Sequence, residues 1–151
     1  MDEENRRQLT TSKVLSRIRA ADSPSEATAY HALNGEPILK DVLYQIMQKN
    51  GFQPKDIILE SGIERSYFYH ILSGYKHPSR NMMLRIGLCV HADCAEMNRL
   101  LRLAGVSGLY PKIRRDALLL YALQEHWSMA RTNTLLIESG EPPLYREEKR
   151  G

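Results

Sequence analysis

The side chains best suited to binding another molecule lie in one short stretch between Gly62 and Gly74. Arg65 carries a planar guanidinium that can donate two parallel hydrogen bonds, and Ser66 carries a hydroxyl that donates or accepts one. His70 carries an imidazole ring whose nitrogens donate or accept hydrogen bonds. These groups recognise a partner through hydrogen bonds and charge, so the chemistry that this stretch suggests is binding.

Motifs for bond-making chemistry are missing from the sequence. It contains no glycine-rich phosphate loop, no HExxH pair and no nucleophile elbow, so we predict no enzyme and no cofactor. Cys89, His91 and Cys94 lie close together in the sequence, but a structural zinc site needs about four ligands and a tighter cysteine pair. We therefore expect buried free thiols and no metal.

Two short helices joined by a tight turn are predicted to position the polar stretch. The first spans about Pro54 to Ser61, and its proline occupies the first helical position, where a missing N–H costs nothing. Gly62 then supplies a left-handed residue, and Ile63 is the apolar residue that packs back after such a cap. The second helix begins near Glu64, runs to about Ser73 and ends at Gly74. Such a pair is typical of a helix-turn-helix motif.

Three further helices are expected in residues 38–104. One spans about Ile38 to Lys49 with an apolar stripe at helical spacing. Ser79 is expected to cap the next, and Asp93 with Glu96 forms a capping box for the last. The apolar residues expected on the inner faces of the five helices are Leu39, Val42, Leu43, Ile46, Met47, Ile57, Ile63, Phe68, Ile71, Met83, Ile86, Val90, Met97, Leu100, Leu101 and Ala104.

Residues 1–37 are predicted to form an N-terminal helical arm. Thr11 or Ser12 can cap a short helix, which ends before Pro24, and a second short helical stretch follows over Ser25–Leu33. We interpret this segment as an arm packed on the rest of the chain, and a disordered segment remains the alternative.

Residues 105–151 are predicted to form a C-terminal helical hairpin. One helix spans about Lys112 to Glu125, Ser128 caps a second that ends before Gly140, and the charged tail after Pro142-Pro143 is expected to be frayed. The apolar faces could cover the core or form a dimer surface. The residues expected to carry them are Ala117, Leu118, Leu120, Tyr121 and Leu123, then Met129, Leu135, Leu136 and Ile137.

Composition limits the class of protein. The 151 residues carry a net charge of +3, and residues 38–104 hold nine Lys or Arg against six Asp or Glu, so the excess lies in that part. No apolar run approaches the roughly 20 residues of a membrane span, and no secretory signal opens the chain. Two cysteines fit a reducing compartment, so we expect a cytoplasmic protein.

The segment from Leu39 to Leu103 resembles the phage-repressor (Cro-like, XRE) helix-turn-helix domain, without a gap. The tail from Leu109 resembles that of a subgroup of Firmicute helix-turn-helix regulators. The resemblance implies an all-α, five-helix lambda-repressor-like bundle, with the arm and the hairpin added to it. The positions that carry it are Leu43, Ile46, Ile57, Gly62, Ile63, Ser66, Phe68, Ile71, Gly74, Pro78, Ser79, Ile86 and Val90.

The resemblance also implies a site. In that family the first turns of the second helix of the motif read base edges in the major groove of double-stranded DNA. A guanidinium at Arg65 would reach O6 and N7 of a guanine. Carried over by position, the base-contacting residues are Glu64, Arg65, Ser66, Tyr69 and His70, and the phosphate-contacting residues are Lys55, Tyr75, Lys76, His77, Ser79 and Arg80.

Two departures from the family pattern, together with added negative charge, predict weak binding by a single chain. Pro54 stands where the family often has a phosphate-gripping glutamine, and Ile58 replaces a small alanine at the helix crossing. Glu60 and Glu64 add negative charge near the expected phosphates. Lys112, Arg114 and Arg115 open the C-terminal hairpin, where DNA backbone, an acidic partner and a purely structural role are all open.

The sequence thus predicts a DNA-binding transcriptional regulator that acts as a homodimer. The alternative is a protein-interaction module on a degenerate helix-turn-helix fold, with little DNA binding. In that case a protein partner would dock on the face formed by Tyr67, Tyr69 and His70, or on the C-terminal helices.

Overall fold

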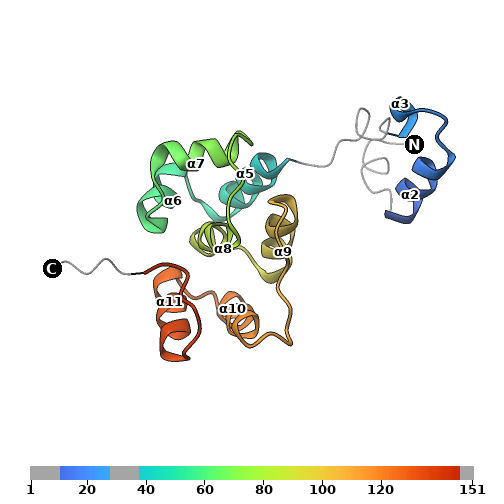
Figure 1. The fold of residues 1–151 in the computed structure, drawn as a ribbon. Helices are drawn as coiled ribbons and strands as arrows, with labels where there is room; N and C mark the ends of the chain where they lie inside the picture. Colours follow the sequence, from blue (N-terminus) through green and yellow to red (C-terminus); the bar gives the residue numbers. More distant parts are fainter. Residues whose placement is uncertain (1–10, 28–37, 147–151) are drawn as a thin grey trace. The chain divides into compact units, whose positions relative to one another are not determined.

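The computed structural model describes residues 11–27 and 38–146. The chain divides after Pro37 into two compact units, which we describe separately. All regular secondary structure in the described residues is helical (Figure 1), so the all-α prediction is confirmed. None of the described helices is long and apolar enough to cross a lipid bilayer.

The N-terminal unit contains two described helices. Helix α2 spans Thr11–Ala20 and helix α3 spans Pro24–Ala27. The hydroxyl of Ser23 accepts a hydrogen bond from the backbone N–H of Glu26 at 3.2 Å, so the chain bends where the sequence predicted a break. The prediction for residues 28–37, including the end of the second helical stretch, lies outside the described residues.

Five helices with nearly the predicted bounds make up the first part of the second unit. Their caps are those expected from the sequence: the Ser79 hydroxyl accepts from the N–H of Met82 at 3.2 Å, and Asp93 and Glu96 exchange two hydrogen bonds of 2.7 and 3.0 Å. The helices are α5 (Leu39–Asn50), α6 (Pro54–Ser61), α7 (Arg65–Leu72), α8 (Arg80–Cys89) and α9 (Cys94–Leu103).

The turn between α6 and α7 depends on Gly62, whose φ is +71°. This left-handed conformation costs a residue with a Cβ atom about 1–2 kcal/mol, and glycine avoids that cost. A guanidinium nitrogen of Arg85 donates to the carbonyl oxygen of Ser61, the last residue of α6. The turn is therefore held from α8 as well as by its own backbone.

Helix α8 lies at the centre of this unit and packs on α6, α9 and α11. The buried apolar side chains form one core that extends from α5 to the C-terminal helices. Of the core residues that the sequence predicted, all are buried except Leu39, which is half-buried. Three of the largest fully buried side chains are Phe68, Met83 and Met97, from α7, α8 and α9.

Helices α10 (Arg114–Gln124) and α11 (Met129–Glu138) form the predicted pair, and Ser128 caps α11 by accepting from the N–H of Arg131 at 3.1 Å. The expected apolar face of α10 was wrong in part. Ala117 and Tyr121 are exposed, while the buried apolar residues are Leu119, Ala122 and Leu123. On α11, Ile137 is likewise exposed.

The segment after Pro142-Pro143 is packed as far as the structure describes it, which corrects the expectation of a frayed tail. Leu144 is buried, and the side-chain oxygen of Asn133 accepts from its N–H at 2.7 Å. The Asn133 amide nitrogen donates to the carbonyl of Tyr145 at 3.1 Å. One buried side chain on α11 thus fixes the returning chain.

The two ends of the second unit differ in what they present. Helices α8 and α9 lie between α6–α7 at one end and α10–α11 at the other (Figure 1). Helix α10 packs on α9, and α11 packs on α8. The C-terminal pair therefore packs on α8 and α9, away from α7, and leaves the outer face of α7 uncovered.

Candidate nucleic-acid interface

Helix α7 has one buried face and one exposed face. Phe68, Ile71 and Leu72 pack into the core, so the helix is held along its inner side. Five predicted base-contacting residues lie together, all exposed, on the N-cap and the outer side: Glu64, Arg65, Ser66, Tyr69 and His70. The structure thus brings these side chains together on a single surface, which we call the α7 face.

Two tyrosine rings contact basic side chains on and beside the α7 face. The guanidinium carbon of Arg65 lies over the ring of Tyr69 at 5.9 Å from its centroid. The ring of Tyr75 meets His70 edge-on at 5.0 Å between centroids, and the amine of Lys76 lies 5.7 Å from the same ring. The four-residue spacing between Arg65 and Tyr69 is a sequence signal for the first contact, because such residues are neighbours on a helix.

The loop after α7 turns back on the end of the helix. The hydroxyl of Ser73 donates to the carbonyl of His70 at 3.1 Å, and the N–H of Lys76 donates to the same carbonyl at 3.0 Å. Tyr75 is 74% exposed, and Lys76 and His77 are also exposed. The loop therefore extends the α7 face with one aromatic and two basic side chains.

Two of the remaining predicted phosphate-contacting residues are accessible to a partner. Lys55 is exposed on the first turn of α6. Ser79 is exposed, and its hydroxyl oxygen accepts the capping bond while its own proton stays free to donate.

The prediction for Arg80 needs correction, because its guanidinium is engaged inside the chain. It donates to both carboxylate oxygens of Asp116, at 3.1 and 2.8 Å, and to the carbonyls of Ser107 and Gly108, at 3.0 and 2.8 Å. Asp116 is 2% exposed and also accepts from the N–H of Tyr110. Arg80 thus joins α8 to α10 and the loop before it.

Arg114 and Arg115 also have structural roles. Arg114 donates to the carbonyl of Ser139 at 2.7 Å and to the carboxylate of Glu141 at 2.9 Å. Arg115 donates to the Asn81 side chain at 2.8 Å, and its partial burial lowers its pKa. The sequence left three roles open for these arginines: contact with DNA backbone, contact with an acidic partner, or a purely structural role. The contacts of Arg114 and Arg115 show the structural role.

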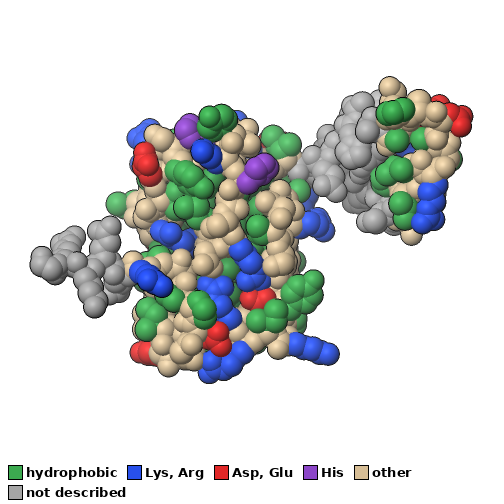
Figure 2. Space-filling model, viewed as in Figure 1, with side chains coloured by type: hydrophobic (Ala, Val, Ile, Leu, Met, Phe, Trp, Pro, Cys, Tyr) green, Lys and Arg blue, Asp and Glu red, His purple; other side chains and the backbone are tan. Residues whose placement is uncertain are grey.

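Charge on the α6–α7 segment is balanced. Residues 53–77 contain three Lys or Arg and three Asp or Glu, which leaves only the two histidines to make the segment basic. Figure 2 shows histidine, basic and hydrophobic side chains exposed together at the α7 end of the second unit. Leu59 on α6 is 86% exposed, and this exposed apolar side chain was not anticipated from the sequence.

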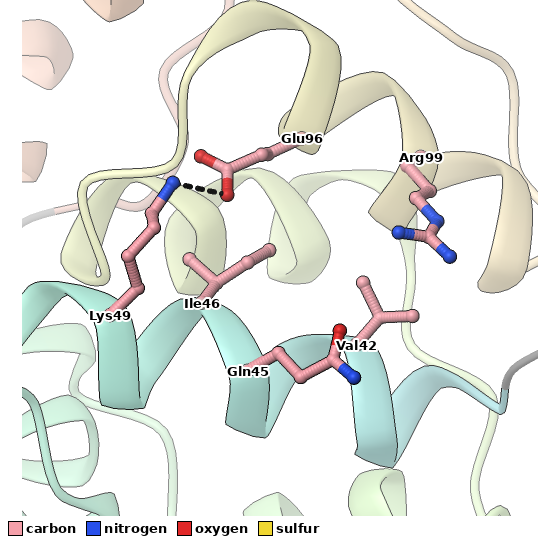
Figure 3. A pocket seen from close by; sticks show the side chains of 6 residues that line it. All are labelled: Val42, Gln45, Ile46, Lys49, Glu96 and Arg99. Carbon is pink, nitrogen blue, oxygen red and sulfur yellow. Dashed lines mark hydrogen bonds and ion pairs between the residues drawn. The ribbon is translucent and has the colours of Figure 1, made fainter.

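A small pocket of about 190 Å³ lies between α5 and α9 (Figure 3). Val42 and Ile46 line it, and the amine of Lys49 pairs with Glu96 at 2.7 Å. This hydrogen bond raises the pKa of Lys49. The second carboxylate oxygen of Glu96 accepts the capping bond from Asp93, so its acidic group is used in holding α5 and α9 together.

The two cysteines are free thiols with internal contacts. Cys89 is buried, its sulfur lies 3.7 Å from that of Met129, and burial raises its pKa to about 12. Cys94 is half-buried, and its sulfur lies 3.7 Å from the carbonyl oxygen of Leu120. Among the described residues, no three His, Cys, Asp or Glu side chains are grouped so that they could hold a metal ion.

Comparison of the chain with models of protein families, with curated proteins and with solved structures finds no match.

Proposed function

We propose that this chain is a sequence-specific DNA-binding transcriptional regulator, and that α7 enters the major groove. The observation that supports this most is the division of α7 into a face fixed in the core and a face of uncovered hydrogen-bonding side chains. A major groove about 12 Å wide accepts one α-helix with its side chains. In this proposal α5 to α9 correspond to the five helices of the phage-repressor-like bundle.

Each side chain on the α7 face has a chemical role in the proposal. Arg65 donates two hydrogen bonds to a guanine, Glu64 accepts from a cytosine amine, and Ser66 and His70 bond to other bases or phosphates. The ring of Tyr69 lies against a thymine methyl group or a sugar. The phosphate contacts come from the side chains around α7, namely Lys55, Tyr75, Lys76, His77 and Ser79.

We further propose that the chain acts as a homodimer in the cytoplasm. The balanced charge of residues 53–77 supports this, because a neutral segment gains little from the phosphate backbone. Two copies of α7, about 34–36 Å apart, would double the contacts and read a palindromic site.

Selection of bound sequences from a random duplex pool tests the proposal. We expect enrichment of a palindromic site with a guanine in each half. Arg65→Ala should reduce the preference for that site, while Lys76→Ala should weaken binding to all sequences and flatten the salt dependence. Arg102→Ala is the control, since that exposed arginine on α9 lies outside the proposed interface. Enrichment of no sequence, or an equal effect of Arg65→Ala on selected and random duplexes, would contradict base reading.

A protein-interaction module is the second candidate, and one observation favours it. Leu59 and Tyr75 are 86% and 74% exposed, and a protein partner would cover such side chains. A salt series with generic duplex DNA separates the candidates. A DNA-binding protein loses affinity steeply as salt rises, whereas a protein-docking module should show no measurable DNA binding even at low salt.

A further inference from the structure

We propose that Tyr69 is a positioning residue: its ring holds the Arg65 guanidinium against the outer side of α7, so that the guanidinium edge is presented to a base. This inference rests on the proposed function and deepens it. It names a residue that strengthens the preference for guanine without contacting the guanine that Arg65 reads.

The geometry of α7 supports the contact. Side chains on a helix lean toward its N-terminus, so the ring of Tyr69 lies over the preceding turn, where Arg65 begins. The 5.9 Å between guanidinium carbon and ring centroid is within the range of a cation–π contact. The Tyr69 ring in turn meets the buried Phe68 ring edge-on at 5.8 Å between centroids. The fully buried Phe68 thus restricts rotation of the Tyr69 ring, and the ring restricts movement of the Arg65 guanidinium.

The contact with the Tyr69 ring leaves the hydrogen-bond donors of Arg65 available. A guanidinium contacts a ring through its flat face, while its five N–H donors lie in the plane and point away. By contrast, Arg80 and Arg114 use their donors on carbonyl and carboxylate oxygens of this chain. No hydrogen bond or ion pair to another described residue occupies the donors of Arg65. Its free edge is what a bidentate contact with guanine O6 and N7 requires.

Fixing the Arg65 side chain before binding should have a measurable effect on base discrimination. An arginine that is mobile before binding loses side-chain freedom when it docks, and that loss weakens the complex. Removal of an exposed cation–π contact should therefore reduce discrimination at the base pair that Arg65 reads by roughly two- to fivefold. Tyr69→Phe keeps the ring and should preserve discrimination at that base pair, whereas Tyr69→Leu should lose it. Tyr69 is 39% exposed, so these changes are compatible with folding, which thermal unfolding checks.

The test is a double-mutant cycle on the full chain. Affinities are measured for the selected duplex and for the same duplex with the guanine replaced, using wild type, Tyr69→Leu, Arg65→Ala and the double variant. If Tyr69 acts through Arg65, the effect of Tyr69→Leu on the ratio disappears in the Arg65→Ala background. Tyr110→Leu, at another exposed tyrosine in the loop between α9 and α10, is the control and should leave the ratio unchanged.

A measurement without DNA separates this inference from the proposed function. Ring currents should shift the NMR signals of the Arg65 side-chain protons in the free protein, and Tyr69→Leu should abolish the shift. If DNA binding is specific but the effects of Tyr69→Leu and Arg65→Ala are additive, the positioning role of Tyr69 would be overturned while the proposed function would stand. The absence of any selected duplex would overturn both proposals. An unshifted Arg65 signal in wild type would show that the ring does not order the guanidinium, and would overturn the inference even if DNA is bound.

Discussion

Replacing Asp116 with alanine should remove the main polar connection between α8 and the C-terminal helices. The carboxylate is 2% exposed and accepts two hydrogen bonds from Arg80 and one from the N–H of Tyr110. Alanine provides no acceptor, so three donors lose their partner at once. Arg80 would keep its two bonds to the carbonyls of Ser107 and Gly108.

The expected loss is about 3 kcal/mol in the free energy of unfolding. Hydrogen bonds to charged groups contribute about 1.5–3 kcal/mol each, but bonds that share one carboxylate are not additive. Loss of one partner from a fully buried ion pair costs about 3–5 kcal/mol. The side chain of Arg80 is 23% exposed, so water can reach its guanidinium and reduce that cost. A loss of this size is a large fraction of the roughly 5–15 kcal/mol that stabilises a domain.

Urea unfolding of the full chain measures this change. The control is Glu141→Ala, which breaks the pair with Arg114, whose side chain is 66% exposed; that substitution should cost no more than about 1 kcal/mol. Arg80→Ala combined with Asp116→Ala should cost less than the sum of the two single changes. A loss below about 1 kcal/mol for Asp116→Ala, or one equal to that of the control, would refute the argument from burial.

Three further predictions concern local features. Asn133→Ala should lower stability by about 2 kcal/mol and speed cleavage of the last residues by chymotrypsin, whereas the exposed Thr134→Ala should do neither. Gly62→Ala should destabilise the chain more than Gly51→Ala in urea unfolding. Both changes force alanine to a φ above +70°, which costs about 1–2 kcal/mol of stability. Only at Gly62 does the new Cβ also lie 3.3 Å from a guanidinium nitrogen of Arg85. Burial raises the pKa of Cys89 from 9.0 to about 12, so stability should be complete below pH 9 and fall as the pH rises towards 12; unfolding curves of Cys89→Ala should lack this part of the decline, and an identical decline would exclude the thiol as its cause.

Local signals were sufficient to predict most of the helices. Ser79, Asp93 and Ser128 cap their helices through bonds to an N–H three residues later, and such bonds depend on a few adjacent residues. The same holds for Gly62, which ends α6 at the predicted position. The exposed side of α7 was also predictable, since Phe68 and Ile71 leave the other side polar.

Long-range contacts were not predictable in the same way. Arg80 and Asp116 are 36 residues apart, and no local pattern indicates that they meet. Alone, Arg80 at the start of a helix looks like a surface cation, so it was assigned to DNA phosphate. The buried face of α10 was ambiguous for another reason: residues 117–123 are apolar on nearly every side except one tyrosine hydroxyl, so periodicity selects no face. The role of Asn133 was not predictable from its neighbours in the sequence either, because its partners Leu144 and Tyr145 lie 11 and 12 residues further along the chain.

The packing of α11 on α8 changes how shortened versions of this protein should be interpreted. A chain cut after Ala104, just past the segment that resembles the phage-repressor domain, would lose Met129 and Asp116 and leave their partners on α8 facing water. Such a fragment is expected to misfold or aggregate. If it failed to retain DNA, the lost packing on α8 would explain the failure, which would not place DNA contacts in the deleted part. Point substitutions on the outer surface of α10 and α11 are the sound way to ask what that region does.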